Sequence, residues 1–173
     1  MLDMYKRFFG SKNRPLQDVI RLRGCYEIAL LDAETQEVIE RRKIDNVVVT
    51  SGRRYVLSRI LSSSPQTDVM NAIAVGTSTT APATGDATLG SEGGGASMRI
   101  AIASFDTSNI GANPPSWQAQ CTFATNQANT TLGEAGLFNS TSSNVQTMLS
   151  HVTFATINKT TSNTLAISYT ISN

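Results

Sequence analysis

The sequence has few of the residues on which catalysis and metal binding usually depend. Its 173 residues include one histidine and two cysteines, and charged residues make up only 16% of the chain. It contains no GxSxG, HExxH or CxxC motif and no recognisable run of zinc or calcium ligands. No Lys-Ser or Lys-Thr pair directly follows the glycine-rich cluster at 90–95, so that cluster is not a phosphate-binding loop. We therefore expect neither an enzyme nor a cofactor nor a bound metal.

The single histidine and both cysteines fit structural roles. His151 lies in a strand pattern with the apolar residues Val152 and Phe154, and we expect it to be a polar-face residue rather than a general base. Cys25 and Cys121 are far apart and fit no metal or redox spacing. They are predicted to be buried free thiols in a protein made in a reducing cytoplasm.

Long apolar runs and an excess of charge are also absent. The longest apolar runs fall well short of the roughly 18 residues of a membrane span, and no apolar run follows Lys6 and Arg7 as in a secretory signal. The net charge is only +1, but residues 1–60 hold 12 of the 14 Lys and Arg residues. We therefore expect no membrane partner. We also expect no nucleic-acid partner, because no aromatic residues interleave with the basic residues Arg41, Arg42 and Lys43. The asymmetry is more typical of a docking segment than of a catalytic centre.

What the chain does have is the pattern of an all-β protein. It is rich in Thr, Ser, Asn, Ala and Gly, and short segments of alternating apolar residues are separated by turn-forming residues. The spacing predicts an antiparallel β-sandwich (jelly-roll-like), with one short helix and an extended N-terminal arm. The clearest alternating runs are 98–105, 117–123, 132–138, 148–154 and 165–171.

The chain divides into an N-terminal docking arm, residues 1–18, and a single sandwich domain, residues 19–173. Within the domain we predict a hairpin over 19–49, a helix over 51–62 with Ser51 as its cap, and the main strands over 71–173. A long loop without secondary structure, residues 77–95, is predicted to be either an exposed functional loop or one that packs on a partner.

The arm carries the residues that we predict to bind a partner. Its apolar side chains cannot be buried within so short a segment, and the turn-favouring residues that follow end any helical turn. A frayed terminus and a membrane-surface helix remain the alternatives. The predicted partner-docking residues are Leu2, Tyr5, Lys6, Arg7, Phe8, Phe9 and Arg14.

Several segments, in a fixed order, resemble a pattern found in virion proteins of tailed bacteriophages and prophages. The resemblance covers roughly residues 45–172, lacks one glycine of the pattern at Ser78, and does not include the first 44 residues. Glu134, Gly136, Leu137 and Phe138 lie in its most distinctive motif, E-A-G-L-F. The matched segments are Asp45-Asn46-Val-Val-Val, Ala72-Ile-Ala-Val-Gly76 with the residues up to Pro82, Asp86-x-x-Leu89-x-x-Glu92, Arg99, Leu132–Phe138, Met148–Phe154 with His151, Ile157–Thr160 and Leu165–Ile171.

The resemblance implies a non-enzymatic structural component of a virion, assembled in the cytoplasm of the host bacterium. It would dock on other virion proteins as a tail, neck or fibre-attachment adaptor, and symmetry makes a homo-oligomer the natural expectation, with trimer, pentamer and hexamer all open. A capsid decoration or cement protein is one alternative. A carbohydrate-binding module for the host surface is another, although only Trp117 and four tyrosines could stack on sugars.

Two features of the motif lead to structural expectations. Glu134 is a carboxylate in an apolar strand and needs a partner, for which Arg99 and Lys159 are the candidates. Gly136 is expected to let two backbones approach each other, while Leu137 and Phe138 lead from the sheet into a turn.

Overall fold

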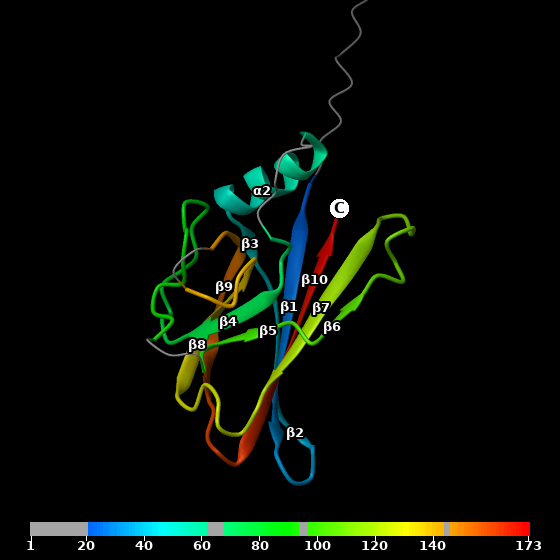
Figure 1. Ribbon diagram of the computed structural model, residues 1–173. Helices are drawn as coiled ribbons and strands as arrows, with labels where there is room; N and C mark the ends of the chain where they lie inside the picture. The colour runs from blue at the N-terminus through cyan, green and yellow to red at the C-terminus, as the bar shows by residue number, and fades with distance from the viewer. Residues whose placement is uncertain (1–20, 62–67, 94–96, 144–145) are drawn as a thin grey trace, which may run out of the picture.

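The alternating segments form the strands of two antiparallel five-stranded sheets that face each other (Figure 1). The computed structural model describes residues 21–61, 68–93, 97–143 and 146–173. In spatial order, the first sheet contains β2 (Val38–Asp45), β1 (Arg23–Asp32), β10 (Asn163–Ser172), β7 (Ser116–Phe123) and β6 (Ser104–Asp106). The second contains β3 (Val47–Val48), β9 (Met148–Asn158), β8 (Thr131–Phe138), β4 (Ala72–Gly76) and β5 (Arg99–Ala101). The predicted all-β sandwich is confirmed, whereas the docking arm lies outside the described residues.

The last strand completes the core, as its regular alternation predicts. Leu165, Ile167, Tyr169 and Ile171 of β10 are all at most 5% exposed, and they face inward together. Strand β10 pairs with β1 on one side and with β7 on the other, so strands from opposite ends of the described chain lie side by side. Their side chains belong to one apolar core with residues from both sheets.

The predicted hairpin forms, but its return strand is shorter than expected. In β1 the side chains of Tyr26, Ile28 and Leu30 are buried. The solvent-exposed face of the hairpin carries an ion pair between Arg41 of β2 and Glu27 of β1 (3.4 Å). Strand β2 ends at Asp45, and residues 47–48 then join the second sheet by pairing with β9. The reason is burial, because Val48 and Val49 are both buried, and consecutive buried side chains do not fit a strand with one face in water.

The single alternating run predicted over 98–105 is wrong, because the structure divides it between the two sheets. Strand β5 pairs with β4 in one sheet, whereas β6 pairs with β7 in the other. The chain crosses at Ile102 and Ala103, whose backbone N–H groups donate to Asn71 and Gln120 in opposite sheets. Alternation marks residues as extended, but it carries no information about which sheet they join.

The helix α2 (Thr50–Leu61) lies at one end of the sandwich, close to the start of β1 and the end of β10 (Figure 1). It begins one residue before the predicted start, and Ser51 does not cap it. The Ser51 hydroxyl instead donates to the Met148 carbonyl (3.0 Å), which ties the helix to β9. A Cβ on Gly52 would lie 2.3 Å from the Leu149 carbonyl oxygen, so glycine permits this close packing.

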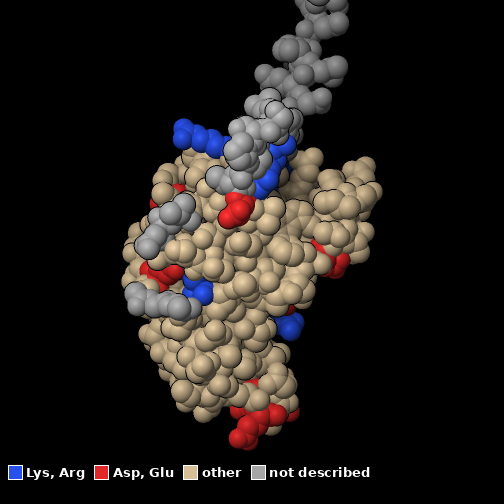
Figure 2. All heavy atoms as spheres, in the orientation of Figure 1, with Lys and Arg blue, Asp and Glu red and all other residues tan. Residues whose placement is uncertain are grey.

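Charge is unevenly spread over the face shown in Figure 2. Basic side chains are prominent at the α2 end, and acidic ones at the tip of the β1–β2 turn, with a largely uncharged surface between them. None of the helical residues that the structure describes forms a segment long and apolar enough to cross a membrane.

Candidate functional site

The centre of the E-A-G-L-F motif, Glu134, is a completely buried carboxylate that binds the loop after β4. Its Oε1 accepts the backbone N–H of Ser91 (2.7 Å) and of Ser78 (3.3 Å), and its Oε2 accepts the N–H of Gly90 (2.8 Å). Bonds from backbone N–H groups to a carboxylate are charge-assisted and stronger than neutral ones. Gly76 leaves room for them, since a Cβ there would lie 2.4 Å from Glu134 Oε1. Glu134 therefore clamps both ends of the loop.

His151 on the neighbouring strand β9 connects Glu134 to the middle of the same loop. Its Nε2 lies 2.9 Å from Glu134 Oε2, and its Nδ1 lies 2.7 Å from Asp86 Oδ2. The Asp86 carboxylate also accepts the backbone N–H of Ala83 (2.8 Å). When both carboxylates are ionised they can only accept hydrogen bonds, and His151 satisfies both of them only as an imidazolium that donates from both nitrogens. We call Asp86, Glu134 and His151 the loop anchor.

The pKa values of the loop anchor shift in the directions that this arrangement requires. Burial opposes the charge on His151, but the hydrogen bonds and charges of Glu134 and Asp86 outweigh it and raise its pKa above 6.5. Burial also opposes ionisation of Glu134, but donation from His151 and the loop N–H groups lowers its pKa below 4.5. The pKa of Asp86 is likewise lowered against the effect of burial by bonds from Ala83 and His151.

A second ion pair holds the far end of the loop. Arg99 of β5 is 4% exposed, its Nε donates to Glu92 Oε1 (2.7 Å), and its guanidinium lies over the ring of Phe138 (3.8 Å to the centroid). It also donates to the carbonyl oxygens of Ser140 (3.1 Å) and Ser142 (3.3 Å). The loop after β4 and the loop after β8 are thereby joined through one side chain.

The remaining motif residues provide the apolar part of the same structure. A Cβ on Gly136 would lie 3.0 Å from Leu89 Cδ2 and 2.9 Å from Phe138 Cε2, so the glycine makes room for the loop's own leucine. Leu89 is 6% exposed, and Leu137 and Phe138 are completely buried. The same Cβ would also lie 3.1 Å from the Ser150 carbonyl oxygen, so Gly136 admits a close approach of the neighbouring strand as well as the loop side chain.

Three expectations about these residues need correction, whereas the described part of the loop at 77–95 is exposed, as one of the two alternatives predicted. The partner of Glu134 is neither Arg99 nor Lys159, because Arg99 pairs with Glu92 and Lys159 donates to the Ala124 carbonyl (2.8 Å) and to Asn129 Oδ1 (2.9 Å). His151 is 4% exposed and is not on a wet face. The described part of the loop at 77–95 is mostly exposed, and it is anchored on its own sheet. Of the two cysteines, both free, only Cys121 is buried, and burial raises its pKa to about 12.

The loop anchor is poorly suited to acid–base chemistry on a substrate. Both nitrogens of His151 already face carboxylates, and its side chain is 4% exposed, so neither nitrogen is placed to accept a proton from a bound molecule. Among the described residues, no group of three His, Cys, Asp or Glu side chains is arranged to hold a metal ion. The arrangement does hold the loop after β4 against strands β8 and β9.

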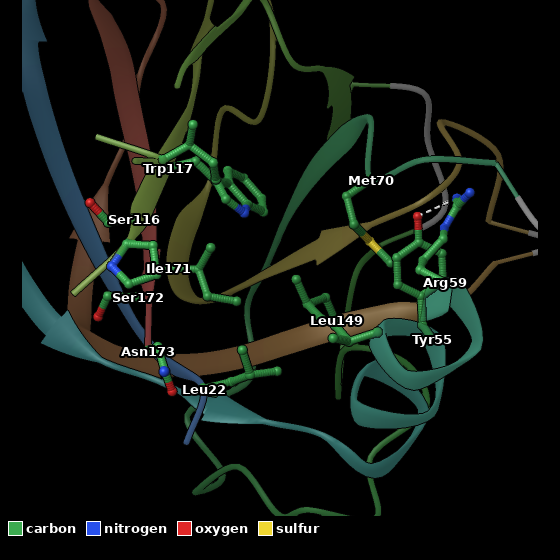
Figure 3. A pocket seen from close by; sticks show the side chains of 13 residues that line it. Leu22, Tyr55, Arg59, Met70, Ser116, Trp117, Leu149, Ile171, Ser172 and Asn173 are labelled. Atoms are coloured by element: carbon green, nitrogen blue, oxygen red, sulfur yellow. Dashed lines mark hydrogen bonds between the residues drawn. The ribbon is translucent and has the colours of Figure 1, made fainter. Parts of the chain in front are cut away.

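An apolar groove, our second candidate site, lies between α2 and the ends of β7 and β10 (Figure 3). Its volume is about 300 Å³, and Trp117, Leu149 and Ile171 form its floor. Arg59 reaches over the Tyr55 ring (4.7 Å to the centroid) and donates to the Tyr55 hydroxyl. The lining also includes Leu22, Val56, Met70, Ile110 and Pro115.

The two classes of predicted site residue have different outcomes. Glu134, Gly136, Leu137 and Phe138 lie together at the loop anchor, joined by Asp86 and His151. Sequence reasoning placed Asp86 in a separate motif and treated His151 as a polar-face residue, and it did not connect either of them with Glu134. The partner-docking residues Leu2, Tyr5, Lys6, Arg7, Phe8, Phe9 and Arg14 lie outside the described residues. Comparison with protein-family models, curated proteins and solved structures finds no match to this chain.

The loop anchor predicts a pH-dependent stability. The raised pKa of His151 means that its contribution is complete below about pH 6.5 and is lost as the pH rises through the raised value. The lowered pKa values of Glu134 and Asp86 mean that theirs is present above about pH 4.5 and is lost as the pH falls through the lowered values. The melting temperature should therefore fall as the pH rises above about 6.5 and through the raised pKa of His151.

The control for this prediction is His151→Gln, which removes the only histidine. Its melting temperature, followed by circular dichroism, should be lower than that of the wild type near pH 6 and should change little over the pH range in which the melting temperature of the wild type falls. An identical slope in the two proteins would show that the loop anchor is not the source of the pH dependence.

Proposed function

We propose that this protein is a non-enzymatic structural component of a tailed-phage virion, which docks on other virion proteins as a tail, neck or fibre-attachment adaptor. The observation that carries the proposal is the convergence of the phage-like motifs. Asp86 and Glu92 come from one motif of the resemblance, and Arg99, Glu134 and His151 come from three others. The five residues meet in two ion-pair clusters on the same loop. Residues that act together in this way support treating the resemblance as one structural pattern rather than as unrelated short matches.

The chemistry of the loop anchor supports a scaffolding role. Charged groups buried at such a depth stabilise one arrangement of a loop when every partner is present, and they are costly when one is missing. A loop fixed in this way presents a rigid surface, which is what a subunit of a particle needs at its contacts. Arg99 and His151 form their ion pairs with carboxylates of this chain, namely Glu92, Asp86 and Glu134. These pairs hold the loop in place.

Labelling the protein on intact virions tests this proposal directly. A fusion tag read out by gold particles in electron micrographs should appear at the tail, neck or fibre base. Label spread evenly over the head would favour the decoration protein instead. Absence from purified virions, or specific binding of the isolated protein to a glycan array, would contradict the proposal.

Deletion of residues 1–18 tests the docking role of the arm. We expect the truncated protein to fold with an unchanged circular dichroism spectrum, because the described core lies wholly within residues 22–171. We also expect it to be missing from assembled particles, since each buried aromatic side chain contributes about 1.5–3 kcal/mol per contact and symmetry repeats the contact. Its abundance in purified virions is measured by immunoblot.

Two comparisons make this experiment specific. Lys6→Ala with Arg7→Ala removes charge but keeps the apolar residues, so incorporation should fall only partly, as it should for the wild type in high salt. Full occupancy by the truncated protein would mean that the arm is a passive tail and that docking belongs to the hairpin or to the loop at 77–95.

A further inference from the structure

The groove at the α2 end has the size and chemistry to bind aromatic side chains. A cavity of about 150 Å³ accommodates a benzene ring, so a volume of about 300 Å³ has room for about two rings. The floor formed by Trp117, Leu149 and Ile171 is apolar. Exposed apolar residues continue the surface, since Ile110 in the lining is 58% exposed and Phe105, whose ring centroid lies 6.1 Å from that of Trp117, is 50% exposed.

The place where the described chain begins points to the occupant. The backbone nitrogen of Arg21 donates to Asn173 Oδ1 (3.1 Å), and the next residue, Leu22, lines the groove. Twenty-one residues of the chain therefore precede Leu22 at the edge of the groove, and they include Phe8 and Phe9. The segment whose sequence contains Phe8 and Phe9 therefore joins the described domain at the edge of the groove.

We propose that the groove binds the segment 2–9 of a second copy of this chain, with Phe8 and Phe9 in the cavity. Twelve residues lie between Phe9 and Leu22, so an extended connection between them reaches about 40 Å. Because the exit and the groove share one end, two copies that meet at their α2 ends place each segment at the other's groove. Such an exchange is reciprocal and closes with twofold symmetry.

The partner of the arm is thus a second copy of the chain. This rests on the proposed function only in that assembly is taken as the protein's role. Its test uses the isolated full-length chain, so it can fail while the protein is still found on virions, and the reverse is equally possible. The chain has one tryptophan, Trp117, which lies half-buried on the groove floor. Its fluorescence therefore reports occupation of the groove.

In the wild type we expect a blue-shifted emission that moves to the red on dilution, together with a dimer in sedimentation velocity that dissociates over the same range. The double variant Phe8→Asp, Phe9→Asp should show red-shifted emission at every concentration. Each lost phenylalanine should weaken self-association about tenfold or more. Lys6→Ala with Arg7→Ala is the matched control and should retain the concentration-dependent blue shift.

A second variant acts from the other side of the contact. Ile110→Asp changes an exposed residue of the lining and should leave the melting temperature nearly unchanged while weakening self-association. Blue-shifted emission that is independent of concentration, in a monomer, would place the segment in its own groove and overturn the proposal. Emission that is unaffected by the Phe8 and Phe9 substitutions would also overturn it.

Discussion

Ile167→Asp is expected to abolish soluble folding. Ile167 is 2% exposed in the central strand β10, paired with Ile28 on one side and Cys121 on the other. An unpaired carboxylate at this position would lie in the apolar core, where its desolvation costs several kcal/mol or more, against a typical total stability of about 5–15 kcal/mol. We expect the variant in the insoluble fraction on expression, with no cooperative melt in any protein recovered.

The matched control is Ala166→Asp, the preceding residue on the outward face of the same strand. Ala166 is partly exposed and pairs with Ala29, which in turn pairs with Arg41 on β2. The new carboxylate would lie in water near a guanidinium, so we expect a change of less than about 1 kcal/mol in the free energy of unfolding. A cooperative, near-wild-type melt for Ile167→Asp would mean that the strand register is wrong.

The strands could be predicted because their signal is local. In β10 four inward residues alternate with polar ones, and this period of two identifies both the strand and its buried face. Sheet membership is a different matter, since residues 99–101 and 104–106 belong to one alternating run and yet to different sheets. What separates them is pairing with Ala72–Ala74 and with Gln118–Gln120, which are distant in sequence.

The loop anchor could be predicted only in part, for a related reason. A carboxylate within an apolar strand indicates that Glu134 needs a partner, because an unpaired buried charge is too costly. It does not indicate which partner, and Arg99 and Lys159 were candidates only because they are the basic residues of the second half of the chain. The true partner, His151, lies directly across the β8–β9 ladder from Gly136, and Asp86 reaches it from 65 residues away. The residues of a loop show no periodic pattern, so the contact between Asp86 and His151 cannot be predicted from the sequence.

Glu134→Ala should be the most damaging single substitution at the loop anchor. It would remove the acceptor of the N–H groups of Gly90 and Ser91, and it would leave one N–H of the buried His151 without an acceptor. Breaking a buried ion pair by removing one partner typically costs about 3–5 kcal/mol, and we expect a loss of that size in the free energy of unfolding, measured by urea denaturation. Amide hydrogen exchange of the loop from Thr77 to Gly93 should rise more than that of β10.

The comparison with a surface pair shows whether burial is the cause. Glu27→Ala removes a strand carboxylate whose partner Arg41 is 60% exposed, and it should cost less than about 1 kcal/mol. The double variant Glu134→Ala, His151→Ala should be destabilised by less than the sum of the two single variants, because it removes the uncompensated imidazolium along with its partner. A cost for Glu134→Ala no greater than that for Glu27→Ala, with unchanged exchange in the loop, would mean that the loop is held by its apolar contacts at Leu89 and not by the buried charges.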